Sequence, residues 1–375
     1  MTNVTNTFDD IRPYLDEEIP AAMQRIVSHK HFPQACALLF PDLEQAEVAE
    51  RMLSCHTVDA FQWRIMYELI GSIVRRTTQG LTVSGLDALD KDKHYLFVSN
   101  HRDIMLDAAF LQKLLVDAGL PTSEITFGAN LMDGQLLIDL GRSNKMFRFV
   151  RPTTASSYRD FLIQIRHVSA YIRYAICQKG ESIWIAQRNG RTKDGLDMTE
   201  QGVINMFCLS GGENRSQSLG ELHIVPVAIS YEWEPCDKLK ALELFARESG
   251  EPYVKKPGED LNSILTGITQ PKGRVHLAAG KPITEEDLRP YNMLPNGDFN
   301  RKVAGMIDER ITSLYRLYPN NYIAAWMLSG KKLGDFTPEQ QQTFEAHVGK
   351  QVQGCPEKVK EILLKIYANP VLRNL

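Results

Sequence analysis

The stretch Tyr95-Leu-Phe-Val-Ser-Asn-His101-Arg-Asp103-Ile-Met-Leu-Asp107 decides how the rest of the chain is interpreted. Its first four residues form an apolar run that is typical of a short buried strand. The polar residues up to His101 suit a turn, and the apolar segment 104–115 is typical of a helix. Open α/β sheets usually bind their ligands beyond the carboxyl ends of such strands. His101, with Asp103 and Asp107 close to it in sequence, is therefore a candidate general base with a carboxylate to orient it.

Two other interpretations of this stretch compete with catalysis. A histidine beside an aspartate is often only a hydrogen bond at the start of a helix. The tripeptide His-Arg-Asp also occurs in the catalytic loop of protein kinases, which requires an Asn five residues after the Asp. Ala108 occupies that position, and the chain contains no Asp-Phe-Gly and no glycine-rich G-x-G-x-x-G loop. The kinase interpretation is thereby excluded.

The composition bounds the class of protein. A chain of 375 residues can form one large domain with appendages, or two domains. Its 43% hydrophobic and 24% charged residues are typical of a globular protein with an ample core. The net charge of −3 leaves no global basic excess that would neutralise phosphates, so a nucleic-acid partner is not expected.

The cysteines and the amino terminus bear on the cellular compartment. The six cysteines form no C-x-x-C pair and no zinc-type spacing with histidines, so we expect reduced thiols and no metal site. The first residues lack the basic and apolar regions of a signal peptide. No window approaches the roughly 18 uninterrupted apolar residues of a membrane span. We therefore expect a cytoplasmic protein, with at most a peripheral position on the inner face of the membrane.

The order of apolar patterns predicts the fold class. We expect an α/β protein with a mixed, largely parallel central sheet flanked by helices, an N-terminal helical domain and a C-terminal helical extension. The expected boundaries are 1–78, 79–290 and 291–375. Within the middle part, segment 234–272 is expected to be an irregular or partly helical insertion. The expected strands are 81–84, 95–99, 125–127, 147–150, 182–186, 222–229 and 275–279.

Basic residues recur where these strands end. Arg151 follows one strand, with Lys145 and Arg148 beside it, and a second strand leads into a loop that combines glycine with cations. Guanidinium groups bind phosphate bidentately, although the same loop composition also suits an ordinary solvated turn. With His101 they suggest a base that works on a phosphate-bearing substrate. No Ser or Cys lies in a nucleophile-elbow context, which favours direct acyl transfer over a covalent intermediate. The loop contains Arg188, Gly190, Arg191 and Lys193.

Taken in order, these residues resemble the motifs of the glycerophospholipid acyltransferases, the family that acylates glycerol-3-phosphate and lysophosphatidic acid. The first family motif is Asn-His, four residues and Asp; here five residues separate Asn100-His101 from Asp107. The second, an aromatic-apolar strand ending in Arg, is matched by 147–151. The third, Glu-Gly-x-Arg-x-Arg, is approximated by 188–193 without the Glu, and the Val-Pro-Val strand by 224–229. The resemblance covers about residues 80 to 285.

The resemblance implies a mechanism and a set of roles. His101, oriented by Asp107 or Asp103, would take a proton from the acceptor hydroxyl. That hydroxyl would attack the thioester of acyl-CoA or of an acyl carrier protein, which is a co-substrate, so that neither a cofactor nor a metal is implied. The acceptor would be a phosphorylated glycerol lipid or its precursor. Its phosphate would be held by Arg151, Arg191 and Lys193, together with Gly190 and Arg188.

Two alternatives remain beside this expectation. The missing Glu of the third motif allows an acyltransferase of the same fold that uses an acceptor without a phosphoglycerol group. A catalytically silent lipid-binding or scaffold protein is the other, although such a protein would not need His101 with two aspartates close by. An amphiphilic product also implies loose contact with a membrane surface.

Overall fold

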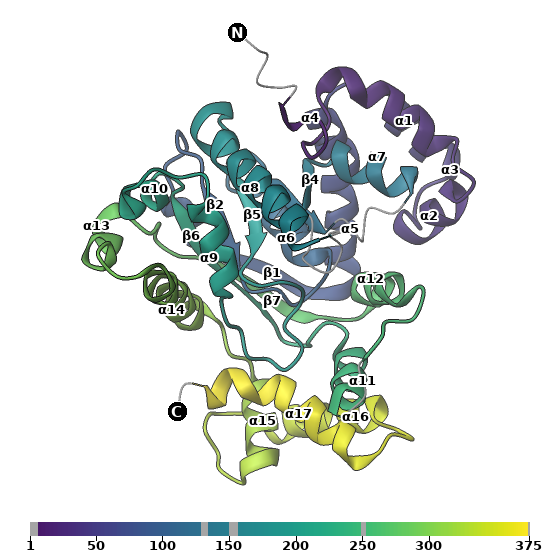
Figure 1. Cartoon of the computed structure of the whole chain (residues 1–375). Coiled ribbons are helices and arrows are strands. Elements are labelled where there is room, and N and C mark those ends of the chain that lie inside the picture. Colours follow the sequence, from purple (N-terminus) through teal and green to yellow (C-terminus); the bar gives the residue numbers. More distant parts are fainter. Residues whose placement is uncertain (1–6, 129–133, 150–156, 249–252, 374–375) are drawn as a thin grey trace.

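The computed structural model describes residues 7–128, 134–149, 157–248 and 253–373, and these ranges include a seven-stranded sheet (Figure 1). The strand order is β1-β7-β6-β2-β5-β3-β4, and every neighbouring pair is parallel except β6 and β7. The expected mixed, largely parallel sheet flanked by helices is thus confirmed. The strands are β1 (Thr78–Ser84), β2 (Leu96–Ser99), β3 (Glu124–Gly128), β4 (Met146–Phe149), β5 (Ile183–Ala186), β6 (Ile224–Tyr231) and β7 (Gly273–Ala279).

The central strands are buried because their sequences are continuous apolar runs. All residues of β2 and β6 are buried, as expected for strands that are covered on both faces. Successive residues of β2 point to opposite faces: Leu96 and Val98 belong to one apolar cluster, and Phe97 to another. The chain leaves β2 at Ser99, so that His101 lies at the carboxyl edge of the sheet.

Helices cover both faces of the sheet. The cluster around Leu96 receives side chains from α8 (Tyr158–Tyr174), α9 (Gln201–Cys208) and α14 (Asn296–Leu314). The opposite face receives α6 (Leu106–Asp117), whose buried residues contact Phe97 and its neighbours. Shorter helices complete these layers: α7 (Gln135–Ser143), α10 (Arg215–Gly220) and α13 (Glu285–Leu288).

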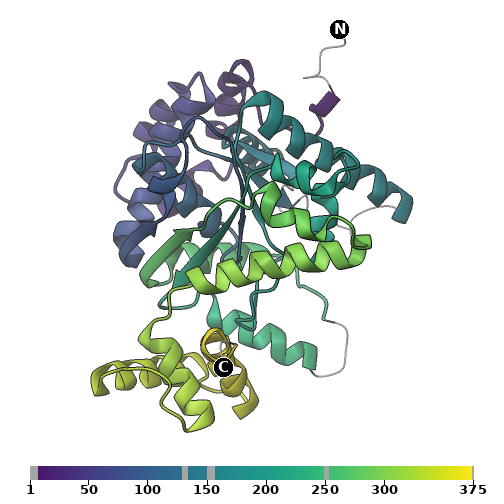
Figure 2. The same cartoon turned by 90° about the vertical axis from the view of Figure 1, so that its left-hand side faces the viewer.

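The N-terminal helices gather at one side of the molecule in both views (Figures 1 and 2). They share a buried cluster with Leu106 and Phe110 of α6 and with Tyr231 of β6, so their apolar faces are part of the core. A π-helical segment, η3 (Gln62–Tyr67), joins the last two of them. The helices are α1 (Ile19–Val27), α2 (Phe32–Leu39), α3 (Gln45–Leu53), α4 (Val58–Phe61) and α5 (Glu68–Thr77).

The C-terminal helices form a further cluster with part of the insertion. α15 (Pro319–Ser329), α16 (Pro338–Gln351) and α17 (Glu357–Leu372) pack with α11 (Asp237–Glu248), and they lie below the sheet in both views (Figures 1 and 2). The insertion 234–272 is partly helical as expected, since it contains α11 and α12 (Glu259–Thr269). In the part of the chain that is described, no helix combines the length and the apolar character needed to cross a membrane.

Candidate active site

His101 and Asp107 form a hydrogen-bonded pair at the carboxyl edge of the sheet. The Nδ1 atom of His101 lies 2.8 Å from Oδ2 of Asp107, which confirms the prediction that His101 contacts one of the two aspartates. The five intervening residues include a non-helical turn, and Asp107 lies in the first turn of α6. The amino end of a helix favours a negative charge. The turn therefore accommodates the additional residue of the spacing and brings Asp107 back to the imidazole.

Asp107 accepts three hydrogen bonds besides that of His101. Its Oδ2 atom accepts from the backbone amides of Arg102 at 2.6 Å and Asp103 at 2.9 Å, and its Oδ1 atom accepts from the Tyr231 hydroxyl at 2.7 Å. Burial and the charge of Asp107 raise the pKa of Tyr231, so the phenol remains a donor. Asp107 is itself buried, and these contacts fix its orientation toward His101.

Asp103 has a different local role from Asp107. Its Oδ1 atom accepts from the backbone amides of Met105 and Leu106, both at 2.9 Å, at the start of α6. Its Oδ2 atom is buried without a hydrogen-bond partner among the described residues. Burial and the charge of Asp107 raise the pKa of Asp103, while Arg191 opposes that shift. Geometry thus pairs His101 with Asp107, and Asp103 holds the turn.

Asp107 and Trp184 together hold the imidazole ring of His101. Because the Asp107 carboxylate can only accept, Nδ1 is the donor, and in the neutral form of the ring Nε2 then carries the lone pair. Nε2 has no hydrogen-bond partner among the residues described. Trp184 of β5 meets the imidazole edge to face, with ring centroids 5.6 Å apart, and its Nε1 atom donates to Ser99 at 2.9 Å. The ring is therefore held on two sides, and its side chain keeps 13% exposure.

Asn100 prolongs the pairing between β2 and β6 with its side chain. Its Oδ1 atom accepts from the backbone amide of Ile229 at 2.8 Å, and its Nδ2 atom donates to the carbonyl of the same residue at 3.0 Å. A second hydrogen bond from Nδ2 reaches Asp197 at 3.1 Å. The Asn before His101 therefore fixes where the chain leaves the strand.

A buried ion network secures the turn after His101. Arg102 is almost fully buried and donates to Asp197 at 2.6 Å and to Glu234 at 3.2 Å. Lys240 of α11 donates to Glu234 at 2.6 Å and to the backbone carbonyl of Arg102 at 2.7 Å. Two cations thus balance two carboxylates. The network joins the loops after β2, β5 and β6 at one edge of the sheet.

The glycine-containing basic loop after β5 runs beside His101. The Gln187 amide donates to the Ser99 carbonyl and the Thr192 amide to the His101 carbonyl, both at 2.8 Å. Gly190 has φ +76° with open space around its α-carbon, a conformation that glycine adopts without strain. Arg188 and Arg191 are half-buried, and each has a buried nitrogen with no hydrogen-bond partner among the described residues. Both unpaired nitrogens are enclosed by neighbouring protein atoms.

The remaining basic candidates differ in position and in pairing. Lys193 forms an ion pair with the buried Glu243 of α11, and burial lowers the pKa of Lys193. Arg151 lies outside the described residues, so its expected convergence with Arg191 stays a prediction. Lys145 lies at the opposite, amino edge of the sheet, where it pairs with Glu181 at 3.0 Å. Arg148 is an exposed residue of β4.

Several residues of the site were not anticipated from the sequence. Tyr231 and Glu234 end or follow the Val-Pro-Val strand, so the rule that identified His101 at a strand end applies to them as well. Trp184 and Asp197 gave no comparable signal, because a buried Trp is ordinary core and an acidic loop residue is ordinary surface. Among the residues described, no group of three His, Cys, Asp or Glu side chains could hold a metal ion.

Comparisons with known proteins found a likeness among the solved structures. No protein-family model matches the chain, and no curated protein matches its sequence. The chain is similar to the crystal structure of the 1-acyl-sn-glycerophosphate (LPA) acyltransferase PlsC from Thermotoga maritima, with a TM-score of 0.41 and 12% sequence identity. The similarity covers 79% of this chain and 94% of that one.

Proposed function

We propose that this chain is an acyltransferase that moves a fatty acyl group from acyl-CoA or an acyl carrier protein to a hydroxyl of glycerol-3-phosphate or lysophosphatidic acid. The observation that supports this most is the 2.8 Å hydrogen bond between His101 and Asp107 at the carboxyl edge of the sheet. The basic loop that carries Arg188 and Arg191 lies directly beside the pair. The motif order in the sequence agrees with this activity.

The proposed chemistry begins at Nε2 of His101. This nitrogen accepts the proton of the acceptor hydroxyl while the hydroxyl oxygen bonds to the thioester carbonyl carbon. Collapse of the tetrahedral intermediate breaks the carbon–sulfur bond, and His101 returns the proton to the leaving thiolate. The products are an ester and a free thiol. Asp107 stabilises the imidazolium that exists between these two proton transfers, and the buried Tyr231 keeps Asp107 in place.

The acceptor phosphate is proposed to bind at the basic loop. Guanidinium groups bind phosphate oxygens, and Arg188 and Arg191 each have one nitrogen without a hydrogen-bond partner among the described residues. Lys193 contributes indirectly in this proposal, since Glu243 already holds its ammonium group. Arg151, which follows β4 in sequence, is proposed as a further phosphate ligand, although β3 lies between β4 and β5 in the sheet.

Contact with a membrane surface is part of the proposal, because an acylated product partitions into lipid. The start of α8 follows β4 and therefore lies toward the carboxyl edge of the sheet. It exposes Tyr158, Leu162 and Ile163, with 77%, 39% and 60% of their surface accessible. Such residues suit shallow insertion between headgroups.

The test measures thiol release from long-chain acyl-CoA, with and without glycerol-3-phosphate or lysophosphatidic acid. Acceptor-dependent release should fall about 10²- to 10⁴-fold in His101→Ala. His167→Ala is the matched control, because His167 also pairs with an aspartate, Asp10 at 3.0 Å, but on the protein surface. Equal release by wild type and His101→Ala would contradict the proposed base, and an acyl-carrier-protein donor should be tried before the activity is rejected.

An acyltransferase with another acceptor is the second candidate. Arg188 or Asn189 occupies the place of the family Glu, and Lys193 is paired with Glu243, so fewer groups remain for a phosphate. His101-dependent release that requires a hydroxylated acceptor lacking phosphate would favour this candidate. No release from either donor with any acceptor would favour the silent lipid-binding protein.

A further inference from the structure

A cavity of about 470 Å³ lies at the edge of the sheet opposite His101. Residues that precede β3, β4 and β5 line it, in the segments 119–122, 144–145 and 180–181. Because β5 is parallel to β2, these amino ends lie at the far edge from the residue that follows β2. The volume is within the range of small-molecule sites. The cavity is therefore separate from the proposed acyl-transfer chemistry.

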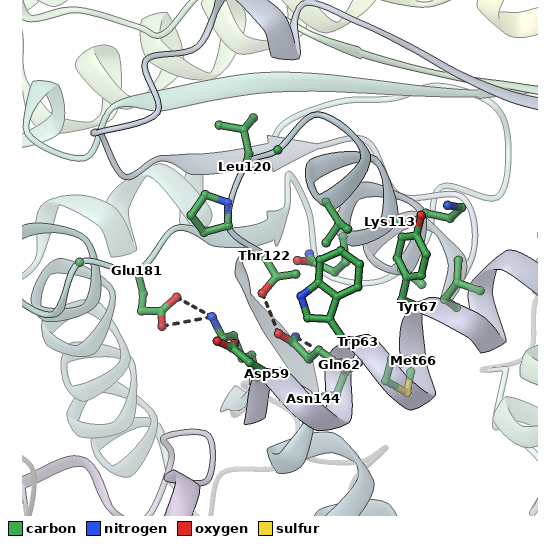
Figure 3. Close-up of a pocket in the computed structure, with 18 residues that line it drawn as sticks. Asp59, Gln62, Trp63, Met66, Tyr67, Lys113, Leu120, Thr122, Asn144 and Glu181 are labelled. Carbon is green, nitrogen blue, oxygen red and sulfur yellow. Dashed lines mark hydrogen bonds and ion pairs between the residues drawn. The ribbon is translucent and has the colours of Figure 1, made fainter. Parts of the chain in front are cut away.

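One wall of the cavity contains two adjacent aromatic rings, and one of them is exposed. Trp63 keeps 55% of its surface exposed, and its ring centroid lies 5.1 Å from that of Tyr67 (Figure 3). Both residues, with Gln62 and Met66, belong to the π-helical segment η3. π-Helical turns within α-helices occur frequently at functional sites. An exposed indole beside a second ring offers a flat surface on which another ring can stack.

The cations that line the cavity are already paired. Lys145 lies 3.0 Å from Glu181, and Lys113 lies 3.1 Å from Asp117 and 4.1 Å above the centre of the Tyr67 ring. Asp59, on the rim, adds a negative charge. A phosphate or carboxylate would therefore meet no unpaired cation among these residues. The charge of the lining favours an uncharged ligand.

Hydrogen-bonding groups form one side of the cavity. The Thr122 hydroxyl donates to the side-chain oxygen Oε1 of Gln62 at 2.7 Å, and Nε2 of Gln62 donates to Oδ1 of Asn144 at a long 3.4 Å (Figure 3). These two hydrogen bonds leave at least one N–H of each amide and the lone pairs of the Thr122 hydroxyl unused, so donors and acceptors remain close to the indole. These groups are placed to form hydrogen bonds with the polar atoms at the edge of a flat ring that stacks on Trp63.

From the open indole, the paired charges and the neighbouring amides, we propose that this cavity binds an uncharged planar heteroaromatic ligand of the nucleobase or nucleoside type. The ligand would also touch α6, since Ala109, Gln112, Lys113 and Val116 line the cavity. The same helix carries Asp107 in its first turn. A ligand in the cavity would therefore contact α6, the helix whose first turn carries the partner of His101.

The experiment titrates the full chain with adenosine and with guanosine. Among its four tryptophans Trp63 is the exposed one, so binding should change its fluorescence in a saturable way. Calorimetry should give a dissociation constant of about 1 mM or tighter for at least one nucleoside. Trp63→Ala should weaken it at least about tenfold, whereas Tyr158→Ala, which removes an exposed ring outside the cavity, should leave it unchanged.

Three results would overturn the proposal. The first is the absence of saturable binding of either nucleoside up to about 5 mM. The second is binding that both Trp63→Ala and Met66→Glu leave intact, with circular dichroism confirming that each variant is folded. The third is adenosine monophosphate binding at least about tenfold tighter than adenosine, which would indicate an anion site. Because binding is measured directly, failure here would leave the proposed acyl transfer unaffected.

Discussion

Asp107 makes more contacts than the hydrogen bond to His101 requires. A carboxylate offers about four acceptor positions, and Asp107 receives an imidazole, two backbone amides and the Tyr231 phenol. The amides belong to Arg102 and Asp103, so the turn that follows His101 closes upon the carboxylate. The phenol is the one donor of the four that reaches Asp107 from another strand. Tyr231 is therefore a positioning residue that can be altered without changing the turn.

Tyr231→Phe should change the pH dependence of the proposed acyl transfer more than its maximal rate. With the phenol removed, the charge of Asp107 is shared among fewer donors and stabilises the protonated imidazole more strongly. The acidic limb of the kcat/KM profile should move to higher pH, with a fall in kcat of about tenfold or less. Tyr171→Phe is the matched control, since Tyr171 is also buried and donates to a carboxylate, Glu124, at 2.7 Å. An unchanged acidic limb would refute the positioning role.

Gly267 of α12 is required by its distance from Asp103. A Cβ atom at this position would lie 2.1 Å from Oδ2 of Asp103, which is buried and cannot move freely. Gly267→Ala should therefore destabilise the protein by about 1–3 kcal/mol, as overpacking does. Gly305→Ala in α14 meets no atom within 4 Å and should be neutral or slightly stabilising. Urea unfolding measures both, and equal effects of the two substitutions would contradict the steric argument.

At the scale of elements, the edge pair β1 and β7 contains a buried histidine. His276 of β7 lies between the hydroxyls of Thr82, at 2.8 Å, and Ser84, at 3.2 Å. Burial, and secondarily the positive charge of Arg316, lowers the pKa of His276 to about 4. The folded state therefore holds this imidazole neutral, whereas an unfolded histidine has a pKa of about 6.5.

The free energy of unfolding should consequently fall as the pH drops from about 6.5 toward 4. In this range His276 binds a proton in the unfolded chain but stays neutral in the folded protein. One such group changes the free energy of unfolding by at most about 1.4 kcal/mol per pH unit. His276→Gln should flatten this slope, and His167→Gln, at an exposed ion pair, should not. Urea unfolding at pH 7.5 and pH 5 compares the variants. If the free energy of unfolding changes equally with pH in His276→Gln and in wild type, His276 is not the origin of the pH dependence.

The elements were predictable from the sequence because their apolar runs are local signals. The strands observed as β2, β5 and β6 begin and end within two residues of their predicted positions, and this accuracy placed His101 at a strand end. Whether Asp103 or Asp107 contacts His101 depends on the backbone path of one turn, and the number of residues between them in the sequence does not determine that path. Lys193 pairs with Glu243 from an insertion whose packing no local pattern reveals.

At the scale of the molecule, the C-terminal helices close the carboxyl edge of the sheet. Tyr367 of α17 donates to Asp237 at 2.8 Å and accepts from the Glu234 amide at 3.0 Å, and Asn369 donates to the carbonyl of Asp194 at 2.7 Å. Glu234 takes part both in these contacts and in the ion network of Arg102. The turn that carries His101 is thus connected to helices more than 200 residues away in sequence.

Arg102→Met tests how strongly this connection depends on buried charge. The substitution leaves Asp197 without its guanidinium partner and should cost about 3–5 kcal/mol in the free energy of unfolding. Adding Asp197→Asn restores the charge balance, because Lys240 still pairs with Glu234, and should recover a large part of that loss. Arg247→Met is the surface control, since the exposed Arg247 pairs with Glu243 and should cost less than about 1 kcal/mol. If Arg102→Met is no more destabilising than Arg247→Met, or if Asp197→Asn adds to its cost, buried charge balance does not hold the C-terminal helices to the sheet. In that case the hydrogen bonds of Tyr367 and Asn369, with the apolar contacts between α17 and α11, would carry the connection.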